Sequence, residues 1–311
     1  MKSNYFVVSK PLRYLNITNI PGFQNIVHKR LIVINQFCNA DAFFLNVCRY
    51  DSSWEKVVFV QTENEAYLHL LFAKISNLYV FVDCSIKLGI LYILKHMKVI
   101  LLEEGIGSYS PQEFVSKRPR IWLRRFLHVG LSLGSSTFID RIYVYRPDVF
   151  LKVAKVNCEV LPFKYNMLDF VIIHKEEFCK LFSLKKLDSL PKKCKVLLYI
   201  TEWSINQNII NFMEEHKTEY DMLIIKPHPH IKFIQELVPI DFKVLSGNMM
   251  AEFLIVELLS RGNELTICHC GSTSVVYFMH DIKSVLFPSE DAGECWRNKY
   301  IEIIKMFYNE K

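Results

Sequence analysis

Three short polar segments, each following an apolar run, carry the side chains that transfer of a group to a hydroxyl requires. In open α/β sheets, sites form where polar residues follow the carboxyl ends of strands. A carboxylate can accept a proton, a histidine can donate one, and hydroxyls beside backbone N–H groups can hold a phosphate. We therefore predict transfer from an activated nucleotide to a hydroxyl. The segments are Glu103-Glu104-Gly105, Lys226-Pro227-His228-Pro229-His230 and Gly271-Ser272-Thr273-Ser274.

The acidic pair follows the apolar run 99–102 and lies beside two glycines, Gly105 and Gly107. A substrate can approach such a loop closely, and a carboxylate there can take the proton that an acceptor hydroxyl loses as it attacks. If strand geometry persists, Glu103 and Glu104 point to opposite sides, so only one of them faces the hydroxyl. The alternative interpretation is a solvated loop whose carboxylate caps a helix.

The histidine segment combines rigidity with positive charge. Pro227 and Pro229 fix the backbone on either side of His228 and hold the imidazole in a defined direction. Histidine changes its charge near neutral pH, which suits a group that protonates or binds a leaving phosphate. Lys226 and His230 add positive potential. The alternative is an ordinary proline-rich turn with a surface histidine.

The hydroxyl segment 271–274 lies between an expected strand and an expected helix. Backbone N–H groups at a helix start, together with hydroxyls, form an anion site, so we expect the nucleotide phosphate here. A helix cap made by Ser or Thr is the simpler interpretation, and it is compatible with a phosphate site. Thr201 follows the expected strand 195–200 and is expected to contact the nucleotide, whereas Trp203 is equally consistent with packing.

The same residues carry a family resemblance. Glu-Glu-Gly resembles the acidic-acidic-Gly motif of bacterial sialyltransferases, the pair at 228–229 resembles their His-Pro motif, and 272–274 resembles their Ser/Thr motif, in the same order. Over roughly residues 100–290, the chain resembles the group that contains the lipooligosaccharide sialyltransferases of glycosyltransferase family 52, the bacterial polysialyltransferases and related capsule enzymes. The commonest family pattern often has Asp where this chain has Glu.

This resemblance implies an α/β fold with two Rossmann-like domains facing a cleft, the GT-B type. It implies inverting, metal-independent transfer of sialic acid, or a related nonulosonic acid, from its CMP conjugate to a hydroxyl of lipooligosaccharide, O-antigen or capsule. Glu104, favoured slightly over Glu103, would be the base, and His228 the general acid or the cation beside the leaving phosphate. No cofactor is expected, since the CMP-sugar is a substrate. The expected donor-binding residues are Lys226, Pro229, Gly271, Ser272, Thr273, Ser274 and Thr201.

Composition sets the broad class. The 311 residues fit two domains of ordinary size, and a hydrophobic content of 51% indicates a globular chain. A net charge of +6 suggests anionic partners, but no cationic and aromatic stripe of the nucleic-acid-binding kind runs along the chain. The nine cysteines form no Cys-x-x-Cys pair, and Cys268 and Cys270 lack further ligands for zinc, because His269 points to the opposite face. We therefore expect reduced thiols, buried in a cytosolic protein, and no metal site.

Apolar runs that alternate between strand and helix spacing predict parallel βαβ units in two domains, an acceptor-binding domain over 1–155 and a nucleotide-sugar-binding domain over 156–311. Expected strands are 6–9, 31–35, 57–61, 79–83, 98–102, 138–145, 195–200, 222–225, 265–270 and 285–288. Expected helices are 63–78, 86–96, 206–216, 251–261 and 274–279.

The segment 117–129 combines five cations with aromatic and aliphatic residues. Helical spacing would place Trp122, Phe126 and Val129 near one face, with Arg124 and Arg125 beside it. This composition is compatible with a helix at an anionic membrane surface, where a lipid-linked glycan acceptor would be found. In the alternative, the apolar side is buried in the core and the arginines are solvated or bind acceptor carboxylates. We expect no secretory signal at the start of the chain, and no apolar stretch reaches the ~18 residues of a membrane span, so we expect a cytoplasmic protein that is either soluble or peripheral on the inner membrane.

Two other functions remain open from the sequence. One is another nucleotide-dependent transferase of surface polymers, which moves Kdo or a polyol phosphate and has a similar His-Pro segment. The other is a non-catalytic protein of capsule assembly that binds a glycan or a membrane. The second predicts that binding survives the loss of Glu103, Glu104 and His228.

Overall fold

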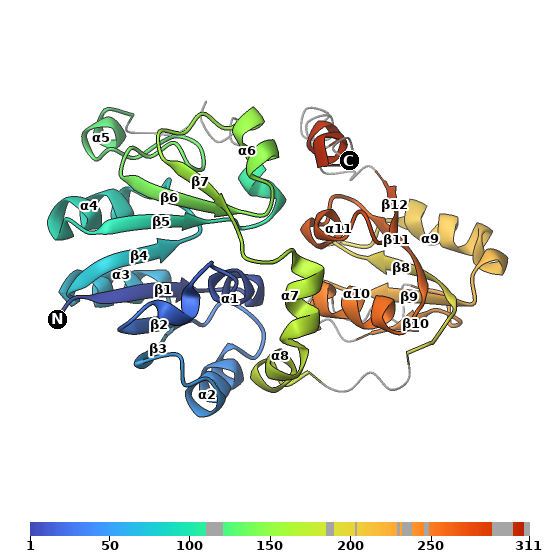
Figure 1. Cartoon of the computed structure of the whole chain (residues 1–311). Coiled ribbons are helices and arrows are strands. Elements are labelled where there is room, and N and C mark those ends of the chain that lie inside the picture. Colours follow the sequence, from blue (N-terminus) through green and yellow to red (C-terminus); the bar gives the residue numbers. More distant parts are fainter. Residues whose placement is uncertain are drawn as a thin grey trace. The chain divides into compact units, whose positions relative to one another are not determined.

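The computed structural model describes residues 1–109, 121–184, 190–202, 204–228, 231, 238–245, 249–287 and 301–307. The chain forms two compact units, each an α/β layered structure around its own parallel sheet (Figure 1). Unit 1 contains Met1–Asn166 and Glu176–Ser183, and unit 2 contains Met167–Lys175 and Leu184–Lys311.

Unit 1 is built on a seven-stranded sheet in the order β3-β2-β1-β4-β5-β6-β7, and every pair of neighbours is parallel. Its strands are β1 (Ser3–Val8), β2 (Lys29–Ile34), β3 (Lys56–Val60), β4 (Ile75–Val80), β5 (Lys98–Leu102), β6 (Ile139–Val144) and β7 (Glu159–Pro162). Its helices are α1 (Pro11–Thr18), α2 (Ala40–Tyr50), α3 (Glu63–Phe72), α4 (Ile86–Lys95), α5 (Ile121–Phe126), α6 (Pro147–Val153) and α8 (Lys175–Leu181), with 3₁₀ turns η1 (Phe23–Asn25) and η2 (Ile106–Tyr109).

Unit 2 is built on a five-stranded parallel sheet in the order β10-β9-β8-β11-β12. Its strands are β8 (Lys195–Ile200), β9 (Met222–Lys226), β10 (Lys243–Val244), β11 (Glu264–His269) and β12 (Lys283–Leu286). Its helices are α7 (Met167–Ile173), α9 (Gln207–Glu215), α10 (Ala251–Ser260) and α11 (Thr273–Tyr277), with a 3₁₀ turn η3 (Lys217–Glu219) and a further helix at 301–307.

The central strands are buried apolar runs because helices cover both faces of a parallel sheet. In β8, every residue from Val196 to Ile200 is buried, and in β5 the four residues from Val99 to Leu102 are buried. In each sheet the strand order reverses once, between β1 and β4 in unit 1 and between β8 and β11 in unit 2. Loops at the carboxyl ends of the strands beside such a switch point are where open α/β sheets bind ligands.

Two sequence expectations about the elements were wrong. The helix expected over 63–78 ends at Phe72, and β4 begins at Ile75 rather than at residue 79. The apolar spacing continued past the real helix end because Ile75 and Leu78 are core residues of the strand, which pairs with both β1 and β5. The domain boundary at 155/156 was placed too early, since β7 pairs with β6 in the first sheet and α8 also belongs to unit 1.

Among the described residues, no helix is long and apolar enough to cross a bilayer. The eight described cysteines form no disulfide, and only Cys84 and Cys268 among them are buried, so the expectation of buried thiols was wrong for the other six.

Candidate active site

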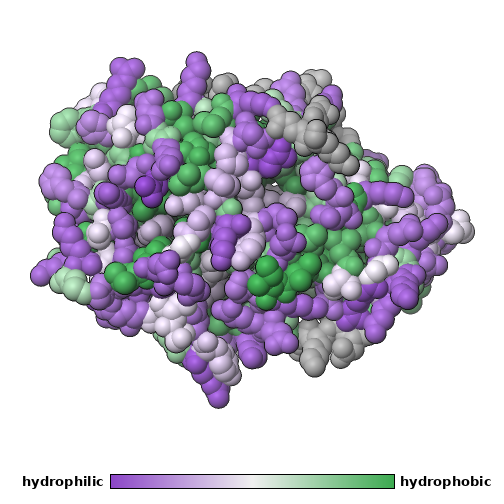
Figure 2. Space-filling view, viewed as in Figure 1, coloured by the Kyte–Doolittle hydropathy of each residue, from purple (hydrophilic) through white to green (hydrophobic). Residues whose placement is uncertain are grey.

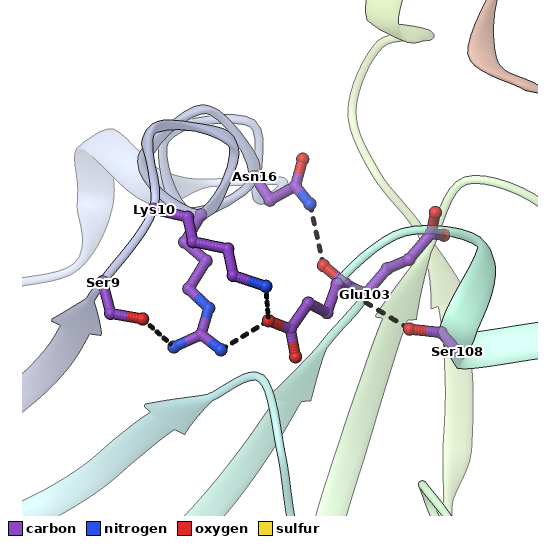
Figure 3. A network of polar contacts seen from close by, with 7 residues as sticks. Ser9, Lys10, Asn16, Glu103 and Ser108 are labelled. Atoms are coloured by element: carbon purple, nitrogen blue, oxygen red, sulfur yellow. Dashed lines mark hydrogen bonds and ion pairs between the residues drawn. The ribbon is translucent and has the colours of Figure 1, made fainter. Parts of the chain in front are cut away.

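The carboxyl edge of the sheet in unit 1 brings the acidic pair together with the start of α1. Ser9 and Lys10 follow β1, and Pro11 occupies the first turn of α1, where its missing N–H costs nothing. Arg13 lies in the same first turn, so its side chain reaches the residues that follow β5. Figure 3 shows this arrangement, with the end of β1 and the end of β5 contributing to one polar network.

Glu104 is held by two cations. Its Oε1 lies 2.9 Å from Lys10 Nζ and 2.5 Å from Arg13 Nη2, and its side chain is 19% exposed. Burial alone would raise the pKa of Glu104, but the charges of Arg13 and Lys10 outweigh it and hold the pKa below the usual value. Glu104 is therefore an ionised, partly accessible carboxylate at neutral pH.

Arg13 is itself fixed on several sides. Its Nη1 donates to Ser9 Oγ at 2.7 Å, and its guanidinium lies over the Phe81 ring, 5.0 Å from the centroid. Its Nε is buried without a hydrogen-bond partner. Beside it is a cavity of about 180 Å³ whose walls are mostly apolar residues of the sheet, α3 and α4, including Ala66, Leu70 and Leu88.

Glu103 has a different environment from its neighbour. Its side chain points away from the cations (Figure 3), and the residue is 1% exposed. The Tyr109 hydroxyl donates to its Oε2 at 2.5 Å, and the backbone N–H of Tyr145 donates to the same oxygen at 2.8 Å. Burial, followed by the Glu103 charge, raises the pKa of Tyr109 well above its usual value, so this hydroxyl remains a donor. Glu103 ties the end of β5 to the end of β6.

Asn16 on α1 strengthens the same connection. Its side-chain amide is fully buried, donates to the Glu103 carbonyl at 2.8 Å and accepts from the Tyr145 hydroxyl at 2.9 Å. The loop that carries the acidic pair is therefore held by α1 on one side and by the end of β6 on the other, which fixes the backbone at Glu104.

In unit 2, the ends of β8 and β9 meet. The backbone N–H of His228 donates to Thr201 Oγ1 at 2.7 Å, which joins two residues that the sequence placed in separate motifs. Lys226 is 5% exposed and donates to the Pro227 carbonyl at 2.7 Å. Burial lowers the pKa of Lys226 to about 8, although the nearby charge of Glu252 acts in the opposite direction.

The hydroxyl segment begins at Gly271, whose φ of 130° is one that only glycine adopts without strain. The backbone N–H groups of Gly271 and Ser272 donate to His269 Nδ1 at 3.1 and 3.2 Å. Ser274 Oγ donates to Glu252 at 2.8 Å. All three donors therefore form hydrogen bonds within the protein, and these bonds stabilise the turn. In this turn Ser272 and Thr273 are half-buried and Ser274 is buried.

His269 is a residue whose role sequence reasoning missed. It is fully buried at the end of β11, and its Nε2 lies 2.8 Å from Ser284 Oγ. Burial lowers its pKa to about 4, so the ring is neutral at physiological pH. A neutral ring whose Nδ1 accepts two N–H bonds must carry its proton on Nε2 and donate it to Ser284. The only signal in the sequence was a histidine inside an apolar run that leads directly into the Cys-Gly turn.

Pro229, His230 and Trp203 lie outside the described residues. Within the described ranges, no group of three or more His, Cys, Asp or Glu side chains is arranged to hold a metal ion.

We expect Ser272→Ala to weaken binding of free CMP by about tenfold or more, because a hydrogen bond to a charged phosphate contributes ~1.5–3 kcal/mol. Ser274→Ala is the matched control. Since its hydroxyl bonds Glu252, that variant should lower the melting temperature more than it lowers affinity. Calorimetric titration with CMP measures the first effect and thermal unfolding the second. Unchanged affinity of Ser272→Ala would place the phosphate elsewhere.

No protein-family model and no curated protein matches this sequence. Solved structures do resemble it. The UDP-GlcNAc 2-epimerase of Neisseria meningitidis aligns over 99% of this chain and 91% of its own, with a TM-score of 0.59 and 13% identity. The wall teichoic acid polymerase TagF aligns over 99% and 83%, with a TM-score of 0.53 and 13% identity. Arabidopsis thaliana UGT89C1, complexed with UDP-L-rhamnose, aligns over 97% and 83%, with a TM-score of 0.54 and 13% identity. The chain therefore has the GT-B fold, as expected from the sequence.

Proposed function

We propose that this protein is a glycosyltransferase that moves sialic acid, or a related nonulosonic acid, from its CMP conjugate to a hydroxyl of a surface glycan. The observation that carries the proposal is the placement of the motif residues within a GT-B fold. The described motif residues lie at or just after the carboxyl ends of β5, β8, β9 and β11. β8 and β11 flank the switch point of their sheet, and β5 and β9 are each one strand further from the switch point of theirs. Enzymes of this kind need a base and a nucleotide site, and the two units each offer one of these.

Unit 1 supplies the base in this proposal. Glu104 is the candidate because it is partly accessible, whereas Glu103 is engaged by Tyr109 and by the backbone of Tyr145. The ion pairs keep Glu104 deprotonated, which makes it ready to accept a proton but only a weak base. It therefore takes the proton late, when the attacking hydroxyl already bonds the anomeric carbon and has become acidic.

Unit 2 binds the donor. Lys226 and His228 supply positive charge near the leaving phosphate, and Thr201 orients the backbone at His228 through its hydrogen bond. Ser272 and Thr273 offer hydroxyls at the turn that His269 supports. Gly271 and Ser274 shape the loop after β11.

The reaction balances without another reactant. The acceptor oxygen forms a bond to the anomeric carbon as the bond between that carbon and the phosphate oxygen breaks. The acceptor proton moves to Glu104, and CMP leaves with its charge compensated by His228 and Lys226. Direct displacement inverts the anomeric centre.

A second candidate is transfer of a polyol phosphate, because TagF was solved with CDPG and its structure aligns with nearly the whole of this chain. The two functions differ in which bond of the activated nucleotide is broken. We would incubate the protein and a glycan acceptor with CMP-sialic acid, CMP-Kdo, CDP-glycerol and UDP-GlcNAc in separate reactions, and analyse the acceptor by mass spectrometry. A mass gain of one nonulosonic acid supports the proposal, whereas a glycerol phosphate gain supports the second candidate.

Activity should persist in excess EDTA, because protein cations and hydroxyls neutralise the single phosphate of the leaving group. Initial rates with and without the chelator should agree within about twofold. Complete loss of turnover that Mg²⁺ or Mn²⁺ restores would reject this mechanism.

CMP affinity should fall as the pH rises through about 8, the value to which burial lowers the pKa of Lys226. Above that pH the folded protein holds a neutral amine, which no longer attracts the phosphate, so the dissociation constant should rise up to about tenfold per pH unit. Calorimetric titrations between pH 6.5 and 9.5 measure this. Lys226→Gln should bind CMP weakly at every pH, and a flat wild-type profile would remove Lys226 from the phosphate site.

A lipid-linked glycan acceptor is the acceptor class that this proposal favours, and it requires the protein to work at a membrane surface.

A further inference from the structure

The described part of the cationic segment, α5 with the residues after it, does not bury its apolar helix face. No residue of α5 is buried, and Trp122 is 73% and Phe126 71% exposed. The alternative in which these side chains complete the core therefore fails for the helix itself. Only Leu127 and Val129, which follow the helix, are buried.

A second helix, α4, also exposes apolar residues. Its outward stripe contains Lys87, Ile90 and Leu94, and both apolar residues of the stripe are exposed. The segment that follows α5 packs against α4, because Leu127 and Val129 meet Gly89 and leave no room for a side chain at that position. Figure 1 shows α5 beside α4 at one end of the sheet in unit 1.

Contacts near α5 hold this arrangement in place. Arg124 Nη1 donates to the Cys84 carbonyl at 3.1 Å, which ties α5 to the loop before α4. This bond directs Arg124 inward, while Arg125 stays exposed. Trp122 and Phe126 are four residues apart on α5 and so lie on one side of the helix.

Charge distinguishes this surface from an ordinary apolar patch. Residues 84–102 and 121–139 contain no Asp or Glu, while α4 and α5 carry Lys87, Lys95, Arg124 and Arg125. Three more cations precede α5 at 117–120, outside the described residues. In Figure 2, hydrophobic residues lie among strongly hydrophilic ones at the edge of unit 1 where α4 and α5 are found.

We infer that α4 and α5 together form a docking surface for an anionic lipid bilayer. Exposed Trp and Phe insert at the interface between headgroups and acyl chains, and surrounding Lys and Arg residues attract anionic headgroups. The inference rests on the proposed function, because an enzyme that uses a lipid-linked acceptor has to bind the membrane that holds this acceptor. It adds α4, which the sequence predicted only as a helix over 86–96.

Vesicle co-sedimentation of the full chain tests this directly. The protein should bind vesicles of phosphatidylglycerol and phosphatidylcholine at least about tenfold more tightly than vesicles of phosphatidylcholine alone, and 0.5 M NaCl should weaken this binding. Trp122→Ser with Phe126→Ser should reduce binding at least about tenfold, and Ile90→Ser with Leu94→Ser should also reduce it. The matched control is Leu45→Ser, since Leu45 is 63% exposed on α2, which contacts β2 and β3 near the other edge of the sheet.

Several outcomes would overturn the inference. These are equal binding to both vesicle types, binding that survives both double variants, or a loss in the Leu45→Ser control as large as theirs. If the double variants instead abolish a dimer detected by sedimentation velocity, the surface joins two copies and the lipid assignment is wrong. CMP release onto a soluble acceptor is measured separately. Turnover without vesicle binding removes only this inference, and vesicle binding without turnover removes only the proposed function.

Discussion

Glu104→Gln should reduce turnover by about 10²–10⁴-fold while leaving CMP affinity unchanged, because the amide keeps the size of the side chain but cannot accept a proton. The proposed donor site is in unit 2, whereas Glu104 belongs to unit 1. Initial rates and calorimetric titration with CMP separate the two quantities.

Glu103→Gln is the matched control, one residue away and identical in chemistry. It should act on stability, since the Tyr109 hydroxyl and the Tyr145 N–H both donate to the buried carboxylate. We expect a loss of about 1–3 kcal/mol in the free energy of unfolding, with most turnover retained in the folded fraction. The reverse ranking of turnover would make Glu103 the base, and two mild effects on turnover would remove both residues from the chemistry.

His228→Ala should lower turnover by at least ~100-fold without a change in melting temperature, because a general acid or phosphate-binding cation typically contributes that much. The fold should tolerate the change, since the contact with Thr201 uses the backbone N–H of residue 228, which alanine retains. Steady-state kinetics with the CMP-activated donor measure the effect.

His280→Ala is the control for this variant. His280 is exposed and precedes β12, so it lies at the amino edge of the same sheet, opposite the proposed site. Its replacement should leave the rate within about twofold of wild type. A near-normal rate for His228→Ala would end its assignment to the leaving group.

Much of the fold follows from local pattern. The buried strands β5 and β8 begin and end where their apolar runs do, and the turn after β11 lies where the Cys-Gly pair places it. Two short strands, β7 and β10, were not predicted. β7 contains only four residues, half-buried or exposed, and it is a strand because β6 offers an unpaired edge. That edge exists only in the folded sheet, so no local pattern marks it.

The candidate site was predictable only in part, for a similar reason. The strand ends identify Glu104 and His228, but their partners come from distant segments. Lys10 and Arg13 lie more than 90 residues from Glu104 in the sequence and reach it because β1 and β5 flank β4 in the sheet. For His269 the sequence predicted only which face of the strand its side chain occupies. Its role in supporting the turn depends on the N–H groups of Gly271 and Ser272, which donate to it in the folded chain.

The most direct measurement of the central claim is acceptor-dependent CMP release from CMP-sialic acid by the purified protein. We predict that CMP appears in proportion to sialylated glycan, that release is at least ~100-fold slower with Glu104→Gln, and that the product has the inverted anomeric configuration. Release from CDP-glycerol or a UDP-sugar but from no CMP-nonulosonic acid, or CMP release that neither requires an acceptor nor depends on Glu104, would contradict the account.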